Sequence, residues 1–424
     1  MPTSPSTAVA NDRGPVSTVA RLPEAADFAA PPTAADRGRW DEADHAARPG
    51  RLARLRERFE GAGVDAYFAV RPEHIRYLSG FVLGAGEDRV AGHSGQLLVG
   101  TEQLVILADS RYTIQAGREA REARIEDVGY DLPGKWAELV NSVGATKVGI
   151  EAGFVSHALW RKLEAAAPDV ELVPIEGWIE AERTIKQSTE VERIAAACAV
   201  ADRALATLLP KIRPGVTESA LALELEWLLR TGGAEAVAFD PTCLAGPQAA
   251  LPHGSPGDLP ILDGAVVLFD FGAQVGGYRS DMTRTLFVGE PTERDLAIYQ
   301  LVRRSQAAAV DQLTATVEGE LELPSGRDLD AISRGLIESD GRWPAYGHGL
   351  GHGIGLATHE APSLSRHASD APLPSPTVFS VEPGIYLPDE TGVRIEDLFH
   401  LDAAAGRVQR LTMFPREVLV VGLG

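Results

Sequence analysis

The sequence predicts an α+β protein built from two folded parts behind an N-terminal tail. Helical and strand-like patterns alternate from Arg51 to about residue 182, which is typical of a mixed sheet covered by helices. Long helical patterns then open at Thr189, and strand-like runs rich in glycine dominate after residue 240. The predicted divisions are a flexible tail, an α/β domain and a second, larger domain at residues 1–48, 49–182 and 183–424.

The predicted tail is rich in Ala, Pro, Ser and Thr and has no hydrophobic period. The Pro31-Pro32 pair interrupts any helix there, since proline lacks the backbone N–H. We therefore interpret residues 1–48 as a mobile tail or an arm that packs on the surface.

The first folded part begins with a helix that carries Leu52, Leu55 and Phe59 at helical spacing and ends near Gly61-Ala62-Gly63. Apolar, β-favouring runs and further helical patterns follow in alternation. The expected strands are 64–70, 96–99, 104–108 and 147–150, and the expected helices are 113–123 and one from Ser156.

The second part is expected to open with two helices. Thr189 and Glu192 have the spacing of a capping box, and an Ala-rich helical pattern continues to about Leu209. Thr217 is a plausible N-cap for a second helix that runs to Arg230.

Composition excludes several classes of protein. The 40 basic and 60 acidic residues give a formal charge of −20, which argues against nucleic-acid binding because that binding depends on neutralising phosphates. An apolar run of 18 residues and a signal-peptide core are both absent from the sequence, so we expect no membrane span and no export. The two cysteines, Cys198 and Cys243, predict no disulfide framework and favour a reducing, cytoplasmic location.

Two aspartates interrupt a predicted β-hairpin at residues 265–288. Its strand-like runs flank a Gly276-Gly277 turn signal. A turn centred between Val275 and Gly276 would place Asp270 opposite Asp281, with Cβ atoms about 4.5–5.5 Å apart. Two like charges so close together are destabilising unless a cation compensates them; the alternative is that one aspartate faces solvent.

A second predicted hairpin repeats this arrangement with two glutamates. Apolar strand-like runs at 377–387 and 392–399 are joined by a short polar turn. Centring that turn on Asp389 places Glu382 opposite Glu396. The repetition favours a carboxylate cage over chance.

Between the hairpins, glycine occupies alternate positions from 347 to 355, around His348 and His352. These glycines disfavour a helix and let the backbone approach a site closely. His352 lies in this glycine-rich run, in the same part of the sequence as the two carboxylate pairs, which favours a role as a metal ligand. The spacing is not HExxH, the chain contains no GxSxG, and Cys243 is interpreted as a buried thiol.

Four carboxylates and one imidazole form a hard, oxygen-rich ligand set. They are Asp270, Asp281, Glu382, Glu396 and His352. Such a set predicts two divalent metal ions, Mn²⁺ in preference to Co²⁺ or Zn²⁺, about 3.5–4 Å apart and bridged by a water that ionises near neutral pH. Arg394 lies two residues before Glu396 and shares its face of the strand.

At these residues the chain resembles the creatinase/aminopeptidase P/methionine aminopeptidase superfamily, the pita-bread metallopeptidases of the M24 type. The motifs are Asp270-Phe-Gly with Ser280-Asp281-Met-Thr-Arg-Thr, Gly-His352-Gly-Ile-Gly-Leu, Val381-Glu382-Pro-Gly-Ile-Tyr and Val393-Arg394-Ile-Glu396-Asp. The branch it most resembles is the Xaa-Pro peptidases, aminopeptidase P and prolidase. The resemblance extends over residues 50–424 and implies a creatinase-like N-terminal domain before a pita-bread catalytic domain.

The resemblance also implies a role for each ligand. Asp270 and Asp281 would chelate or bridge one metal, His352 would ligate the other, and Glu396 would bridge them. Glu382 would be both a ligand and the general base that takes a proton from the bridging hydroxide.

Other residues match positions around the metals in the Xaa-Pro branch. His253, in Leu251-Pro-His253-Gly, resembles a histidine that contacts the scissile amide. His359, in Thr-His359-Glu360-Ala-Pro, resembles one that steadies the tetrahedral intermediate or passes on a proton. Arg394 resembles an arginine that orients substrate and outer carboxylates, and His348 is assigned only a supporting or packing role.

The implied activity is hydrolysis of the Xaa-Pro bond at the N-terminus of peptides, that is, an Xaa-Pro aminopeptidase acting on peptides with proline at the second position. The alternatives are an Xaa-Pro dipeptidase (prolidase) and an M24-type amidohydrolase that acts on a non-peptide amide. A creatinase-like hydrolase, a methionine aminopeptidase and an inactive binding module fit less well, because all five ligands and the N-terminal domain are present. A homodimer stays open as an oligomeric state.

Overall fold

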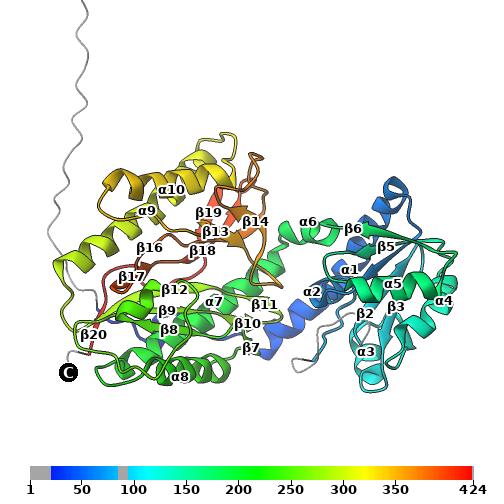
Figure 1. The fold of residues 1–424 in the computed structure, drawn as a ribbon, viewed down its shortest axis with the longest axis horizontal. Helices are drawn as coiled ribbons and strands as arrows, with labels where there is room; N and C mark the ends of the chain where they lie inside the picture. Colours follow the sequence, from blue (N-terminus) through cyan, green and yellow to red (C-terminus); the bar gives the residue numbers. More distant parts are fainter. Residues whose placement is uncertain (1–20, 85–93, 423–424) are drawn as a thin grey trace, which may run out of the picture.

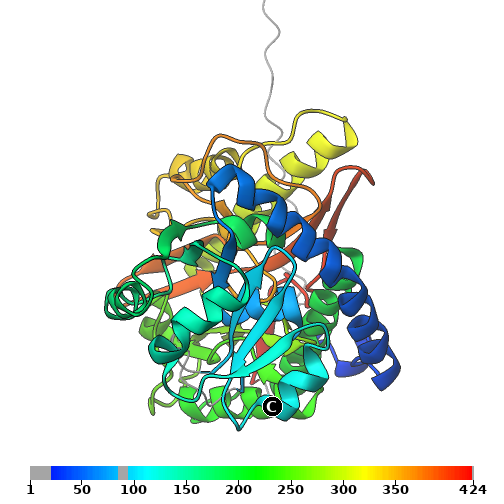
Figure 2. The ribbon, with the colours of Figure 1, turned by 90° about the vertical axis from the view of Figure 1, so that its right-hand side faces the viewer.

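The molecule has two lobes, seen side by side in a computed structural model that describes residues 21–84 and 94–422 (Figure 1). The N-terminal lobe holds the expected α/β domain, and the larger lobe holds the rest of the chain. The first twenty residues of the predicted tail lie outside the described residues. Figure 2 looks onto the N-terminal lobe, with the long first helix crossing the face of the molecule.

A six-stranded sheet in the order β4-β3-β2-β1-β5-β6 forms the centre of the N-terminal lobe. Its strands are β1 Ala66–Ala69, β2 Gln96–Gly100, β3 Leu104–Ala108, β4 Arg124–Asp127, β5 Lys147–Glu151 and β6 Glu171–Ile175. The helices are α1 Ala34–Ala62, α2 Pro72–Ser79, α3 Thr113–Glu119, α4 Leu132–Ser142, α5 His157–Ala166 and α6 Trp178–Thr184, with a 3₁₀ turn at Ala25–Asp27. The expected strands and helices of this domain are confirmed, with small differences at their ends.

Alternation along the strands explains how this sheet is covered on both faces. Tyr67 points into the core that contains residues of α1, α2 and α3, whereas Phe68 points into the core built with α4 and α5. Successive side chains of a strand point to opposite faces, so a continuously apolar strand requires helices on both sides.

The prediction of a flexible tail up to residue 48 is wrong for residues 34–48, which form the first half of α1. The helix begins at a capping box in which Thr33 accepts from the backbone N–H of Asp36. Its first turns are held by polar contacts: the Trp40 indole N–H donates to Glu192, and Arg48 donates to the Glu119 carbonyl. Hydrogen bonds of this kind leave no hydrophobic period in the sequence, so the sequence pattern does not predict a helix at residues 34–48.

The larger lobe opens with α7 Ser188–Leu208 and α8 Glu218–Thr231. The predicted capping box at Thr189 and Glu192 is wrong, because Gln187 caps α7 and pairs with Glu190. The predicted N-cap of α8 is confirmed, since Thr217 accepts from the backbone N–H of Ala220.

Two larger and two smaller sheets follow in this lobe. The larger ones have the orders β20-β12-β9-β8 and β14-β13-β15-β18-β19, and the smaller ones are β11-β10-β7 and β16-β17. The strands are β7 Ala236–Val237, β8 Thr242–Ala245, β9 Val266–Phe271, β10 Ala273–Val275, β11 Tyr278–Arg279, β12 Met282–Val288, β13 Gly351–Gly353, β14 Glu360–Leu364, β15 Thr377–Val381, β16 Gly384–Leu387, β17 Thr391–Arg394, β18 Asp397–Asp402, β19 Arg407–Arg410 and β20 Val420–Val421.

Two helix pairs enclose these sheets, as expected of a pita-bread fold. One core joins α7 and α8 to β9 and β12, and another joins α9 Glu293–Glu318 and α10 Gly326–Asp340 to β15–β18. The chain also contains short 3₁₀ turns at Leu209–Lys211 and Gly246–Ala250. In the described part of the chain, every helix is too short or too polar to cross a bilayer.

The first predicted hairpin exists with a different register. Gly276 and Gly277 both have positive φ and form the turn, so its centre lies one residue later than expected. Asp270 is consequently paired with Thr283 and not with Asp281. By this register Asp281 is the diagonal neighbour of Asp270 on the same face, which still brings the two side chains to one site.

The second predicted register is confirmed. Val381 pairs with Asp397 and Gly384 pairs with Arg394, so the two ladders continue one register through the break between them. That register places Glu382 opposite Glu396. Asp389 lies in the turn between the two strands and has a positive φ of 62°.

Candidate metal centre and active site

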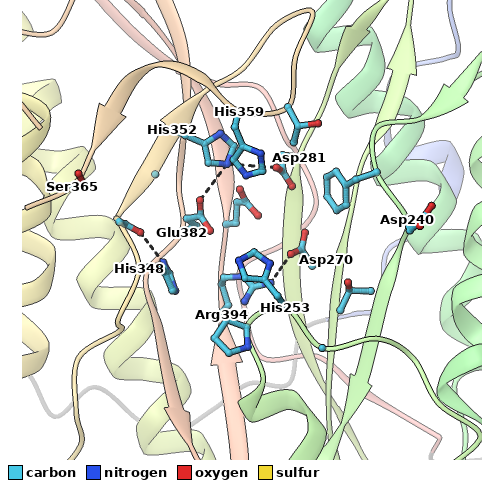
Figure 3. Close-up of a pocket in the computed structure, with 18 of the residues that line it drawn as sticks. Asp240, His253, Asp270, Asp281, His348, His352, His359, Ser365, Glu382 and Arg394 are labelled. Atoms are coloured by element: carbon cyan, nitrogen blue, oxygen red, sulfur yellow. Dashed lines mark hydrogen bonds and ion pairs between the residues drawn. The ribbon is translucent and has the colours of Figure 1, made fainter. Parts of the chain in front are cut away.

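One cavity of about 520 Å³ gathers every residue that the sequence singled out for chemistry (Figure 3). Those residues are His253, Asp270, Asp281, His348, His352, His359, Glu382, Arg394 and Glu396. They come from separate strands and loops of the larger lobe, so the fold, and not proximity in the sequence, assembles the site.

Interruptions of the strands position three of the four carboxylates. Asp281 lies between β11 and β12, Glu382 between β15 and β16, and Glu396 between β17 and β18. Asp270 is in β9 and His352 is in β13. A local break in the ladder lets a strand aim a side chain at a site while its two halves remain paired.

The carboxylates converge on His352. Ligand atoms of Asp281, His352 and Glu396 all lie within 4.8 Å of one another. The Nε2 atom of His352 is 3.3 Å from Oε1 of Glu382 and 3.7 Å from Oδ2 of Asp281. Figure 3 shows His352, Glu382 and Asp281 pointing toward one another.

Several oxygens in this cluster have no protein donor. Asp270 Oδ1, Asp281 Oδ1 and Glu396 Oε1 are buried and make no hydrogen bond within the described residues. Burial, followed by the neighbouring carboxylates, raises the pKa of Asp281 and Glu396 well above the ordinary values. Unpartnered buried oxygens and mutual repulsion both call for a cation, so these residues fit a metal centre.

The imidazole of His352 is oriented for ligation. Its Nδ1 atom donates to the Gly353 carbonyl at 3.0 Å, which leaves Nε2 facing the carboxylates with a lone pair. Burial lowers the pKa of His352. The neutral form, which is the form that binds metals, is therefore favoured.

Arg394 holds one edge of the cluster. Its Nη2 donates to Asp270 Oδ2 at 2.5 Å, its Nε donates to Thr283 Oγ1 at 3.0 Å, and its Nη1 donates to the Tyr386 hydroxyl at 2.8 Å. The Tyr386 hydroxyl also lies 2.9 Å from Nε2 of His348. His348 thus supports this network, in line with the supporting role expected for it.

Three residues of the site carried no predicted role. Thr283 donates to Glu396 Oε2 at 2.8 Å, Ser380 donates to Glu382 Oε1 at 3.2 Å, and Tyr386 links Arg394 to His348. Strand alternation gives a signal for two of them. Thr283 lies two residues after Asp281, and Ser380 lies two residues before Glu382.

Two further histidines face the cavity without being part of the carboxylate cluster. His253 lies on the turn after the 3₁₀ segment Gly246–Ala250, and His359 directly precedes β14. The rings of His359 and His352 are 4.3 Å apart between centroids. Partial burial, followed by the cost of protonating a second imidazole beside His352, lowers the pKa of His359 to about 4, so its imidazole is neutral at neutral pH.

Comparison with known families gives one assignment for each lobe. Residues 192–403 match the model described as "Metallopeptidase family M24", and residues 51–185 match "Creatinase/Prolidase N-terminal domain". The chain therefore belongs to metallopeptidase family M24 and is a hydrolytic peptidase with a pita-bread catalytic domain.

Several proteins similar to this chain are Xaa-Pro peptidases. The Xaa-Pro dipeptidase of Pyrococcus furiosus is 32% identical, over 87% of this chain and 99% of that protein. A solved Xaa-Pro dipeptidase from Bacillus anthracis superposes with a TM-score of 0.79 at 32% identity, covering 88% of this chain and all of that one. A solved X-Pro aminopeptidase from Thermotoga maritima MSB8 has a TM-score of 0.76 at 32% identity, covering 87% and 99%.

These relatives confirm the resemblance to the Xaa-Pro branch of the family. Between the two activities predicted within that branch, the similar proteins favour the dipeptidase over the aminopeptidase. The individual roles expected for His253, His359, Glu382 and Arg394 stay predictions, as does the choice of metal.

Proposed function

We propose that this protein is an Xaa-Pro dipeptidase (prolidase) that depends on two divalent metal ions, with Mn²⁺ the expected ion. The observation that carries the proposal is the set of buried carboxylates around His352, with their unpartnered oxygens, inside a cavity of about 520 Å³. A cavity of this size is in the usual range for small-molecule sites, which suits a dipeptide. Relatives that bear the name Xaa-Pro dipeptidase add support.

Asp270, Asp281, His352, Glu382 and Glu396 would hold the metals. Bound there, divalent ions would polarise the scissile carbonyl and lower the pKa of the attacking water. Oxygen-rich ligand sets of this kind suit Mn²⁺.

Glu382 is the candidate general base. Burial raises the pKa of its carboxyl, and Ser380 fixes one of its oxygens. A carboxylate with a raised pKa is better matched to taking a proton from water near neutral pH. The same group would return the proton to the proline nitrogen, which has no N–H and must be protonated to leave.

His359 and His253 would act on the substrate. A neutral imidazole at His359 can donate one N–H to the oxygen that gains charge as the carbonyl is attacked. His253 would contact the substrate near the scissile bond from the opposite loop. Arg394 would keep Asp270 in place through its direct contact.

A substrate series with one metal tests this proposal. The Mn²⁺-loaded protein is expected to hydrolyse Gly-Pro and other Xaa-Pro dipeptides, with kcat/KM at least about tenfold lower for Xaa-Pro tripeptides, since one unfavourable contact of about 1.4 kcal/mol suffices. Equal or faster cleavage of tripeptides and longer peptides would instead identify an Xaa-Pro aminopeptidase.

The aminopeptidase is the second candidate function. The solved X-Pro aminopeptidase of Thermotoga maritima, as similar in sequence as the dipeptidases, is the observation that favours it. Failure to cleave any Xaa-Pro peptide would exclude both activities.

A further inference from the structure

The residue directly after His359 is held in a buried ion cluster. The Glu360 carboxylate accepts from Lys186 Nζ at 2.9 Å and from Arg183 Nη2. All three side chains are at most 4% exposed. A buried carboxylate that lost these cations would be uncompensated, so the cluster constrains the chain strongly at this point.

The cations of this cluster come from the junction between the two lobes. Arg183 is in the last turn of α6, and Lys186 lies in the short connection between α6 and α7. Lys186 Nζ also donates to the Arg183 carbonyl at 2.6 Å, and its backbone N–H donates to the Pro376 carbonyl at 2.9 Å. Helix α6 packs beside β14, so the junction is clamped onto the strand that begins at Glu360 (Figure 1).

The imidazole of His359 has no hydrogen bond of its own among the described residues. Its position therefore depends on the backbone that carries it. On one side Thr358 accepts from Arg279 Nη1 at 2.9 Å, and on the other side Glu360 is fixed by the cluster. The preceding residues 355–359 form a series of bends and not a strand, so the ladder gives them little support.

The loop is also shaped around the Glu360 carboxylate. A Cβ atom placed on Gly355 would lie 2.5 Å from Glu360 Oε1, and the backbone N–H of Ala357 donates to Glu360 Oε2 at 3.4 Å. The turn from Gly355 to His359 thus folds over this one carboxylate. Removing the charge would weaken the contacts that hold this turn to the junction.

We propose that Glu360 is a positioning residue for His359 and that Arg183 and Lys186, from the lobe junction, set its position. The inference rests on the proposed function, because it gives His359 a part in that reaction. Glu360 does not line the cavity, and its side chain bonds to Arg183, Lys186 and the backbone of Ala357, so it acts by fixing where the neighbouring imidazole lies.

A double-mutant cycle tests the proposal on the Mn²⁺-loaded full-length protein with an Xaa-Pro dipeptide. Glu360→Gln keeps the side-chain shape and is expected to lower kcat about 10- to 100-fold, because small misplacements of an acting group cost that much. KM and metal content should stay close to wild type. In a His359→Ala background, which should itself retain metal, Glu360→Gln should change kcat by less than about twofold.

A crystal structure and one control variant complete the test. A crystal structure of Glu360→Gln should show the His352–His359 centroid distance changed from 4.3 Å. Glu151→Gln removes another buried carboxylate, in the N-terminal lobe, and should leave kcat unchanged. If Glu360→Gln does not fold, Lys186→Met takes its place in the double-mutant cycle. That variant keeps Arg183 as a partner of Glu360.

The outcomes separate the two claims. An inactive wild-type protein with metal bound would contradict the proposed function. An active wild-type protein in which Glu360→Gln, or Lys186→Met in its place, lowers kcat by the same factor with and without His359 would overturn the positioning role.

Discussion

Asp270 and Glu396 each keep one oxygen on a protein donor and leave the other without one. Arg394 holds Asp270 Oδ2 and Thr283 holds Glu396 Oε2, while Asp270 Oδ1 and Glu396 Oε1 have no hydrogen bond. The held oxygen orients the carboxylate, and the open one is available to a cation. Because each of these two carboxylates is held by a protein donor and can also bind a cation, several acids can be buried close together.

Removal of one ligand is expected to empty the centre. Asp281→Ala should abolish metal binding and activity together, with kcat/KM reduced by at least about 10³-fold, because metal removal takes away both the Lewis acid and the activated water. Metal content measured by mass spectrometry checks this. As a control, Asp240→Ala changes an acid at the cavity wall outside the cluster and should leave the metal content unchanged. If the Asp281→Ala variant bound as much metal as the wild-type protein, Asp281 would not be a ligand.

A second prediction for a single residue concerns Glu382, the candidate general base. Glu382→Gln should lower kcat about 10²- to 10⁴-fold, which is the usual contribution of a positioned base. Stopped assays at saturating dipeptide, with metal content measured in parallel, provide the check. Near-normal turnover would remove Glu382 from that role.

At the scale of elements, β13 can only lie where it does because it carries glycines. A Cβ atom on Gly351 would be 1.9 Å from the Ser380 carbonyl oxygen of β15, whereas one on Gly347 would meet nothing within 4 Å. Close approach of the two strands is what brings His352 to Glu382.

Gly351→Ala should therefore push β13 away from β15. We expect the free energy of unfolding to fall by about 1–3 kcal/mol, as for other overpacked sites, together with weaker metal binding. Gly347→Ala, in the same glycine-rich run, should stay within about 0.5 kcal/mol of wild type. Urea unfolding of both variants measures this, and equal stabilities would show that the strands can separate without cost.

The sequence predicted the elements of the site better than their registers. The glutamate hairpin was predicted in its true register because its turn is symmetric about Asp389. The predicted turn of the aspartate hairpin is centred one residue before the observed turn, because the two adjacent glycines are compatible with either position. The Glu360 cluster could not be predicted at all, since its partners lie more than 170 residues away along the chain.

For the whole molecule, the acidic balance matters less than where the acids lie. The 60 acidic residues exceed the 40 basic ones by 20, but among the described residues only a few acids are buried together without a cation for each. Burial and mutual repulsion raise the pKa of Asp281 and Glu396 in the metal-free protein. Their folded-state pKa values thus exceed the unfolded values of about 4.

The raised pKa values of Asp281 and Glu396 predict how the stability of the protein depends on pH and on bound metal. A carboxyl with a raised folded pKa binds more protons when folded, so metal-free stability should fall as the pH rises above about 4 toward the raised values. Divalent ions are expected to bind the ionised carboxylates and to add about 2.7 kcal/mol at 100 times their Kd. Calorimetry at pH 5 and pH 8, with metal and with chelator, should show a larger metal-induced increase in Tm at pH 8; a larger increase at pH 5 would contradict this linkage.

One cluster of five side chains is expected to hold two metal ions for peptide hydrolysis. Anomalous diffraction from crystals soaked in Mn²⁺, recorded near the manganese edge, tests it most directly. The structure predicts two anomalous peaks among Asp270, Asp281, His352, Glu382 and Glu396. A map with no peak in that cavity, or with its peaks elsewhere on the molecule, would contradict it.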